Sequence, residues 1–265
     1  MSAISAASAR SVQTFYDDLA ADYHHLYADW NAAVDRQGAT LNSLLRRELG
    51  PGSHRVWDCA CGIGTQAIGL AALGHDVVGT DLSPNAVTRA AREAAARTLT
   101  LRVAAADMRR LPVTPGAFDA VLCADNSLAH LLTEDDVHAA LSAMREALRD
   151  EGLLVVSMRD YDRWREEHPV STPPQVTHTD AGRVISFQLW HWHTDGEHYD
   201  LEHIQLLPTA DNSEWRVRTR RTTSWAITAE QLTDLVAAAG FTHIGWQAPE
   251  ESGYFQPLLT ARKQR

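Results

Sequence analysis

The chain has 265 residues, of which 45% are hydrophobic and 22% are charged. These proportions are typical of one ordinary globular domain with room for a small additional cap. The 24 Lys and Arg residues against 34 Asp and Glu residues give a net charge of −10. Because an acidic surface repels phosphate backbones and anionic membranes, we expect neither nucleic acid nor a membrane surface as a partner.

No targeting or metal-binding signal stands out in the chain. The first ten residues are small and polar, and no apolar stretch approaches the ~20 residues that span a bilayer, so a cytoplasmic protein is expected. Cys59, Cys61 and Cys123 lie in apolar runs, without a second Cys-x-x-Cys or a His pair at ligand spacing. We interpret them as small buried side chains and predict no metal site.

The N-terminal segment has the pattern of two helices. Between residues 11 and 49, large apolar residues recur at spacings of three and four; the first of them are Phe15, Leu19, Tyr23, Leu26, Tyr27 and Trp30. The run Gly50-Pro51-Gly52 supplies a helix stop and a turn. Residues 1–50 are therefore predicted to form a helical lid that precedes any strand.

Short apolar runs then alternate with longer helical stretches. Strands are predicted at 56–59, 76–80, 101–105, 120–124 and 153–157, and helices at 65–73, 84–97 and 135–148. Strands that are apolar on both faces and separated by helices favour a parallel sheet with helices on both faces. The fold class expected is α/β, of the Rossmann-like kind.

The pattern changes after the fifth predicted strand. Three runs alternate with period two, at 183–193, 199–207 and 215–225, and turn signals separate them at Asp195-Gly196 and Asp211-Asn212-Ser213. They predict a small antiparallel β cap inserted over residues 159–225. A helix at 228–239 and strands at 242–246 and 255–261 would complete a seven-stranded, mostly parallel sheet, with the main domain made of 51–158 and 226–265.

A glycine-rich turn follows the first predicted strand. Ala60, Gly62 and Gly64 present little or no side chain, so the backbone can approach a ligand closely. Asp81 ends the next strand, 19 residues after Gly62 (81 − 62), where a carboxylate can accept hydrogen bonds from ribose hydroxyls. A ribose-bearing cofactor is predicted, with a spacing that differs from the Gly-x-Gly-x-x-Gly of dinucleotide sites.

With Asp58 before it, this turn resembles the first motif of class I S-adenosylmethionine-dependent methyltransferases. The resemblance implies S-adenosyl-L-methionine as cofactor and S-adenosyl-L-homocysteine as product. It also implies that Asp107 meets the adenine amino group and that Met108 packs on the ring. The cofactor contacts expected in this part of the chain are Asp58, Ala60, Gly62, Gly64, Asp81, Leu82, Asp107 and Met108.

Two further runs, Asn126-Ser127-x-Ala129-His130-Leu131 and Arg159-x-Tyr161-Asp162, resemble the glycine N-methyltransferase group, including the glycine/sarcosine methyltransferases. The resemblance implies that Asn126 and Arg159 contact substrate, with Arg159 holding a carboxylate. For Arg159, a salt bridge to Asp160 or Asp162 is the structural alternative. The resemblance also implies further cofactor and pocket contacts at Tyr23, Tyr27, Trp30, Arg36 and Ala124, with Tyr27 on the substrate side.

This chain departs from the glycine enzymes at two places. They have a glycine where this chain has Asp125, and they have a tyrosine near the position of Ser224 or Trp225. We expect Trp225 among the substrate contacts, and Asp125 or His130 as the group that removes a proton.

In the cap, His191, His193, His198 and His203 are interpreted as ordinary strand residues. The arginines 216, 218, 220 and 221 are interpreted as a solvated edge, with a phosphate anchor as the alternative.

The leading functional hypothesis is N-methylation of the amine of a small, carboxylate-bearing molecule. One alternative is O- or C-methylation of a specialised metabolite, including one with a phosphate or pyrophosphate. Another is a non-catalytic regulator that binds S-adenosylmethionine, and a nicotinamide dehydrogenase is the remaining enzyme class. Homo-oligomerisation is left open.

Overall fold

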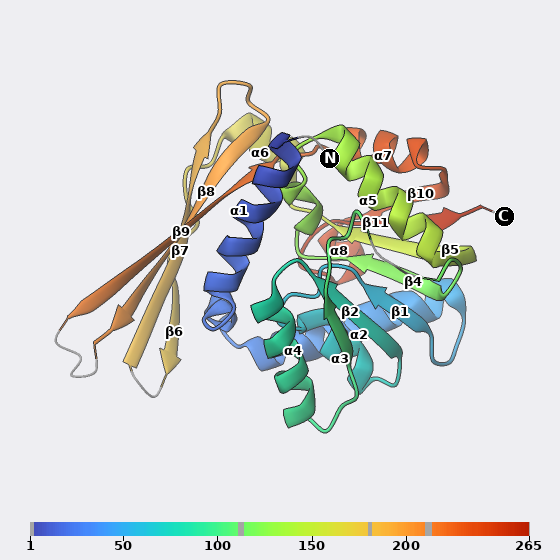
Figure 1. Cartoon of the computed structure of the whole chain (residues 1–265), viewed down its shortest axis with the longest axis horizontal. Helices are drawn as coiled ribbons and strands as arrows, with labels where there is room; N and C mark the ends of the chain where they lie inside the picture. Colours follow the sequence, from blue (N-terminus) through green and yellow to red (C-terminus); the bar gives the residue numbers. More distant parts are fainter. Residues whose placement is uncertain (1–2, 111–113, 180–181, 210–213, 265) are drawn as a thin grey trace.

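A computed structural model describes residues 3–110, 114–179, 182–209 and 214–264, with side chains from residue 11 onward. It contains a seven-stranded sheet in the order β10-β11-β5-β4-β1-β2-β3 and a separate four-stranded sheet in the order β6-β7-β8-β9 (Figure 1). The α/β class, the seven strands and the antiparallel cap are therefore confirmed. The turn predicted at Asp211-Asn212-Ser213 lies outside the described residues.

The seven-stranded sheet is mostly parallel. β1 pairs in parallel with β2 and β4, β2 with β3, and β4 with β5, whereas β11 is antiparallel to both β5 and β10. The strands are β1 (Arg55–Asp58), β2 (Asp76–Asp81), β3 (Arg102–Ala105), β4 (Phe118–Cys123), β5 (Leu148–Ser157), β10 (Phe241–Gln247) and β11 (Leu258–Lys263). The carboxyl ends of the parallel strands consequently share one edge of the sheet.

Helices cover both faces of this sheet. Successive residues of a strand point to opposite faces, and both faces carry apolar side chains that must be buried. Val121 and Val156 pack against α5 (Glu134–Ala147) and α7 (Ala229–Ala238), whereas Leu122 and Val155 pack against α2 (Trp30–Leu49) and α3 (Thr65–Ala72). Side-chain caps fix several helix starts: Asp29 caps α2, Ser83 caps α4 (Pro84–Ala96) and Thr133 caps α5.

Helices α2 and α3 approach each other unusually closely. A Cβ atom added at Gly69 of α3 would lie 2.5 Å from the carbonyl oxygen of Val34 and 2.8 Å from Cα of Gly38, both in α2. Real Cβ atoms do not come this close to backbone, so the packing requires glycine at this position. The position of α2, and with it the N-terminal segment, depends on this contact.

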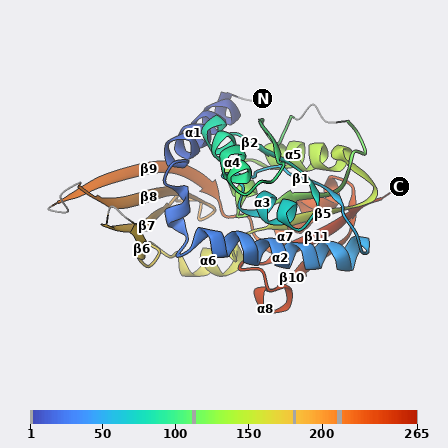
Figure 2. The same cartoon turned by 90° about the horizontal axis from the view of Figure 1, so that it is seen from below.

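The four-stranded sheet follows β5 and a short helix, α6 (Tyr161–Glu167). Its strands are β6 (Gln175–Thr179), β7 (Gly182–Trp192), β8 (His198–Pro208) and β9 (Trp215–Trp225), all antiparallel to their neighbours. The sheet extends away from the larger one (Figure 2). The sequence did not predict β6 or α6, because β6 is only five residues long and α6 is a charged segment with little apolar periodicity.

The N-terminal segment lies between the two sheets. Helix α1 (Ala3–Leu19) packs beside β9 and α4, and the short helix η1 (Tyr23–Leu26) leads into α2 (Figure 1). Two further short helices complete the described structure: η2 (Ser127–His130) after β4, and α8 (Pro249–Ser252) between β10 and β11. Among the described helices, none is long and apolar enough to pass through a bilayer.

Candidate active site

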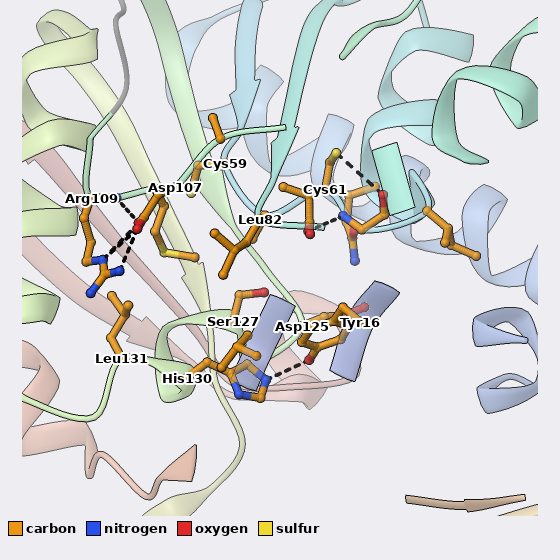
Figure 3. Close-up of a pocket in the computed structure, with 18 of the residues that line it drawn as sticks. Tyr16, Cys59, Cys61, Leu82, Asp107, Arg109, Asp125, Ser127, His130 and Leu131 are labelled. Carbon is orange, nitrogen blue, oxygen red and sulfur yellow. Dashed lines mark hydrogen bonds and ion pairs between the residues drawn. The ribbon is translucent and has the colours of Figure 1, made fainter. Parts of the chain in front are cut away.

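A cavity lies at the carboxyl ends of β1, β2, β3 and β4, the edge where open α/β sheets bind ligands. The residues that line it come from the loops after these strands and from α1, η1, η2, α3 and α5; several are labelled in Figure 3. They include the predicted residues Tyr23, Ala60, Gly62, Asp81, Leu82, Asp107, Met108, Asp125 and His130. We call this space the cofactor cavity.

The turn after β1 forms one wall of the cofactor cavity. Gly62 and Gly64 have φ angles of +52° and +97°, which residues with a Cβ atom adopt at a cost. A Cβ atom at Gly64 would lie 2.8 Å from Cδ1 of Ile68, whereas one at Gly62 would meet no atom within 4 Å. Gly64 thus allows α3 to pack, and Gly62 leaves the cavity side of the turn open.

The side chain of Asp81 connects the end of β2 to the glycine turn after β1. Its Oδ2 accepts a hydrogen bond from the backbone N–H of Gly62 (2.9 Å), and its Oδ1 accepts one from that of Ser83 (2.8 Å). Burial raises the pKa of Asp81. The carboxyl group lines the cavity beside Leu82, in the place that the sequence predicted for a ribose contact.

Asp107 is held in place by Arg109, which was not among the predicted site residues. Arg109 pairs through Nη2 with Asp107 (2.6 Å) and through Nη1 with Asp136 (2.7 Å), and all three residues line the cofactor cavity. Although burial raises the pKa of Asp107, the hydrogen bonds from Arg109 hold it below its usual value. Asp136 lies in the first turn of α5.

Asp58 lies at the end of β1, beneath the glycine turn, and does not line the cavity among the described residues. It is fully buried, and neither of its carboxyl oxygens forms a hydrogen bond within the described structure, although the Ala60 backbone amide favours its charged form. Burial raises the pKa of Asp58 to about 8. Its carboxyl group is therefore mostly protonated at neutral pH.

A second cavity, the acceptor chamber, lies between the N-terminal segment and the four-stranded sheet and has a volume of about 340 Å³. Its lining includes the predicted residues Tyr27, Asn126 and Arg159, together with residues of β7, β8 and β9. Four residues line both cavities: Tyr16, Tyr23, Asp125 and His130. The two spaces therefore meet at these side chains, three of which were predicted; Tyr16 was not.

Arg159 follows β5 and lacks an acidic partner in the described structure. Its Nη1 donates to the Tyr199 hydroxyl (3.2 Å), its Nη2 donates to Oε1 of Gln188 (3.1 Å), and its guanidinium lies 4.9 Å from the ring centre of Trp164. Asp160 and Asp162, the alternative partners, instead accept backbone N–H groups of Arg163 and Ala229. A cation held only by neutral groups faces the acceptor chamber.

Asp125 and Asn126 form a left-handed bend after β4, with φ angles of +55° and +67°. The Tyr27 hydroxyl donates to Oδ2 of Asp125 (2.9 Å), and burial raises the pKa of Asp125. Asn126 accepts from the backbone N–H of Arg159 (3.1 Å) and donates to the hydroxyl of Tyr161 (2.7 Å). The side chain of Asn126 thus fixes the start of the Arg159 segment while lining the chamber.

His130 lies at the junction of the two cavities. Its Nε2 is 2.7 Å from the hydroxyl oxygen of Tyr16 (Figure 3). Burial lowers the pKa of His130 to about 4. The imidazole is therefore neutral near pH 7, and it is a weak base.

Six predicted contacts do not line either cavity among the described residues: Trp30, Arg36, Asp58, Gly64, Ala124 and Trp225. Trp30 packs on α3 and donates to Thr65 Oγ1 (2.9 Å), and Arg36 lies on the exposed face of α2. Trp225 packs in the core with its ring centre 6.0 Å from that of His198, and its neighbour Ser224 lines the chamber instead.

The three cysteines are buried, as expected, and no cluster of three or more potential metal ligands occurs in the described parts of the chain. Three of the four cap arginines are paired with acidic side chains. Arg218 and Arg220 pair with Asp22, and Arg221 pairs with Glu202.

Residues 56–152 match the sequence profile of a family described as the methyltransferase domain. This segment contains the glycine turn, Asp81, Asp107 and the bend at Asp125, and it belongs to the seven-stranded fold described above. Residues 56–152 form a class I S-adenosylmethionine-dependent methyltransferase domain. The predicted recognition is confirmed, and S-adenosylmethionine is the cofactor of this domain class.

A glycine/sarcosine N-methyltransferase of Parasynechococcus marenigrum is 40% identical to this chain over 139 residues, which cover 52% of this chain and 48% of that protein. The chain thus spans about half the length of the curated relatives it matches. CalS10 of Micromonospora echinaspora, an amino pentose methyltransferase with S-adenosylmethionine bound, has a TM-score of 0.72 at 23% identity, covering 92% and 95% of the chains. The sugar N-methyltransferase KedS8 of a Streptoalloteichus species has a TM-score of 0.72 at 22% identity, covering 88% of each. At sequence identities this low, the structural similarity to these two proteins shows only that the fold is shared.

Proposed function

We propose that this protein is an S-adenosylmethionine-dependent methyltransferase that acts on the nitrogen of a small molecule bearing a carboxylate or another anionic group. The observation that carries this proposal is Arg159. Its guanidinium lies in a chamber that opens onto the cofactor cavity at Asp125, and no acidic side chain of the described structure pairs with it. An anionic acceptor would supply the missing partner.

The cofactor cavity has the features that an adenosyl group requires. Asp81 is proposed to bind the ribose hydroxyls, and Asp107, held by Arg109, the adenine amino group, with Leu82 and Met108 beside the ring. The open cavity face at Gly62 leaves room for the ligand. When bound, S-adenosylmethionine supplies the methyl group: the acceptor nitrogen lone pair forms the N–CH₃ bond while the C–S bond breaks and its electron pair stays on sulfur, giving S-adenosylhomocysteine.

The residues at the junction of the cavities would align the amine and manage its proton. We assign the proton-accepting role to Asp125, because its carboxyl group lines both cavities, the Tyr27 hydroxyl holds it in place, and burial raises its pKa, which makes it a stronger base than an ordinary carboxylate. His130 is the weaker candidate, because its pKa is lowered to about 4 and its Nε2 is engaged with Tyr16. Holding the acceptor nitrogen in line with the methyl group would supply most of the rate enhancement.

The alternative functions receive less support. O-methylation would need a committed base, and a neutral His130 bound to Tyr16 is poorly suited to that role. The phosphate anchor at the cap arginines is disfavoured, since Arg218, Arg220 and Arg221 are paired with acidic side chains. A non-catalytic regulator would have no use for a second chamber joined to the cofactor cavity. The curated N-methyltransferase relative and the sugar N-methyltransferase structure are in keeping with nitrogen as acceptor.

The test is a mass-spectrometric screen of amines, amino acids, phenols and phosphorylated compounds for the gain of one methyl group. For the acceptor found, Arg159→Gln should raise KM by about tenfold or more, because a charge-assisted hydrogen bond is worth about 1.5–3 kcal/mol, while the Kd of S-adenosylhomocysteine stays unchanged. Arg163→Gln is the matched control, since Arg163 is an exposed arginine that pairs with Glu167. An unchanged KM in Arg159→Gln would remove the basis for an anionic acceptor.

A further inference from the structure

The wall that the four-stranded sheet gives to the acceptor chamber is mostly polar; its lining residues are Gln175, Ser186, Gln188, Leu201, His203 and Ser224. On β8, every second residue is buried, and these residues include Tyr199, His203 and Gln205; the buried face of β9 carries Thr222 and Ser224. The buried face of an antiparallel sheet is normally apolar. Because burying polar groups without hydrogen bonds costs free energy, this face requires polar partners.

Two of these residues line the chamber and lack partners. Both ring nitrogens of His203 and the hydroxyl of Ser224 are buried without a hydrogen bond in the described structure, and the two residues are 0% and 1% exposed. Burial lowers the pKa of His203 to about 4, so its ring is neutral and offers one donor and one acceptor. The wall therefore presents neutral donors and acceptors to whatever fills the chamber.

These two positions lie far apart on the sheet. His203 is opposite Gln188 on β7, and Ser224 is opposite Tyr199 on β8, four residues from His203, which corresponds to ~13 Å along the strand. Gln188 and Tyr199 are the two side chains that hold Arg159. A ligand with its anionic group on Arg159 would therefore have neutral hydrogen-bonding groups on both sides, at a separation that glycine cannot span.

The size of the acceptor chamber also favours an acceptor larger than glycine. A volume of about 340 Å³ lies within the range of roughly 300–1,000 Å³ that is usual for sites of drug-sized molecules. None of the cap tryptophans lines the chamber in the described structure: Trp190 packs at a tilt against Trp164, and Trp225 stacks on His198. Hydroxyl groups both donate and accept, and they match neutral His and Ser side chains.

We infer that the acceptor is a polyhydroxylated amine with an anionic group, an amino sugar acid in chemical type, whose hydroxyls bind His203 and Ser224 while its anionic group binds Arg159. The inference rests on the proposed function, which assigns the amine to the junction at Asp125. It goes further in naming the body of the acceptor and the residues that select it.

Calorimetry on the full chain saturated with S-adenosylhomocysteine tests the inference with three probes. Glucosaminate has hydroxyls, an amine and a carboxylate; glycine lacks the hydroxyls, and glucosamine lacks the carboxylate. Glucosaminate should bind about tenfold tighter than either of the others. Ser224→Ala and His203→Leu should each weaken glucosaminate by roughly three- to tenfold, without changing its Kd ratio between pH 6 and pH 8 or the Kd of S-adenosylhomocysteine.

Thr223→Ala is the matched control, because the Thr223 hydroxyl donates to Asp200 on the other face of the sheet; its glucosaminate affinity should stay at the wild-type value. Glycine binding as tightly as glucosaminate, or glucosaminate affinity that is unchanged in Ser224→Ala, would overturn the inference and leave the proposed function standing. The expected binding pattern without methyl transfer to any amine would instead contradict the proposed function alone.

Discussion

At the scale of single residues, Asp58 links burial to pH-dependent stability. Its folded pKa of about 8 exceeds the ordinary value of 3.8, so between these two pH values the folded state keeps a proton that the unfolded state has lost. The free energy of unfolding therefore falls as the pH rises through this window and levels off above pH 8. Below about pH 4, both states are protonated, and Asp58 has no effect.

Asp58→Asn removes this dependence. Relative to wild type, the variant should gain about 1.4 kcal/mol of unfolding free energy per pH unit between pH 5 and pH 7, measured by urea denaturation. Asp119→Asn is the control, because hydrogen bonds from Arg149 outweigh burial and hold the pKa of Asp119 below its usual value. Its difference from wild type should be constant over this range. A constant difference in Asp58→Asn as well would show that the buried carboxyl is ionised.

The sequence predicts a site residue when its position follows from the strand or turn that carries it, and does not predict one that is positioned by tertiary packing. Gly62, Asp81 and Asp107 lie at or shortly after the ends of β1, β2 and β3. These strands are neighbours in the sheet in the same order as in the chain, so their positions in the sequence predict that the three residues lie close together. Tyr16 and Arg109 reach the cofactor cavity through tertiary packing that no local pattern encodes. Exposure of Arg36 and burial of Trp225 likewise depend on how whole elements pack, which spacing along the chain does not reveal.

At the scale of elements, the α2–α3 contact makes a specific demand on the sequence. Gly69→Ala would place a methyl group against the carbonyl oxygen of Val34, so the helices must separate. We expect a loss of about 1–3 kcal/mol in the free energy of unfolding, as for other overpacked contacts, measured by chemical denaturation. Gly245→Ala is the control, because a Cβ atom there meets no atom within 4 Å. Equal stabilities of the two variants would show that α2 adjusts freely.

The elements themselves differed in how well the sequence predicted them. The strands of the larger sheet were predicted because most of them are apolar and they are bounded by turn or helix signals. The strand β5 begins at Leu148, directly after α5, rather than at residue 153, because its first residues form an extended edge that lacks an apolar pattern. β6 escaped prediction because pairing with β7, and not its own composition, makes it a strand.

At the scale of the whole molecule, Asp22 connects the N-terminal segment to the cap. Its Oδ2 binds Arg218 (2.5 Å) and the buried Arg220 (3.1 Å) of β9. Asp22→Asn keeps the shape but removes the charge, and it should lower the free energy of unfolding by about 1–3 kcal/mol. Hydrogen–deuterium exchange should increase at residues 11–27 and 215–221.

Asp18→Asn is the matched control, because only the backbone oxygen of Asp18 binds Arg220 and its side chain is exposed. Its exchange should resemble that of wild type. Exchange in Asp22→Asn that is unchanged in both segments would mean that apolar packing alone holds α1 against the cap.

Tyr16 and Tyr23 belong to the walls of both cavities, and both come from the segment that Asp22 attaches to the cap. A displacement of that segment wide enough to admit one ligand unavoidably disturbs the compartment of the other. We therefore expect an ordered sequential kinetic mechanism for the proposed reaction, in which S-adenosylhomocysteine cannot leave while the acceptor chamber is still occupied.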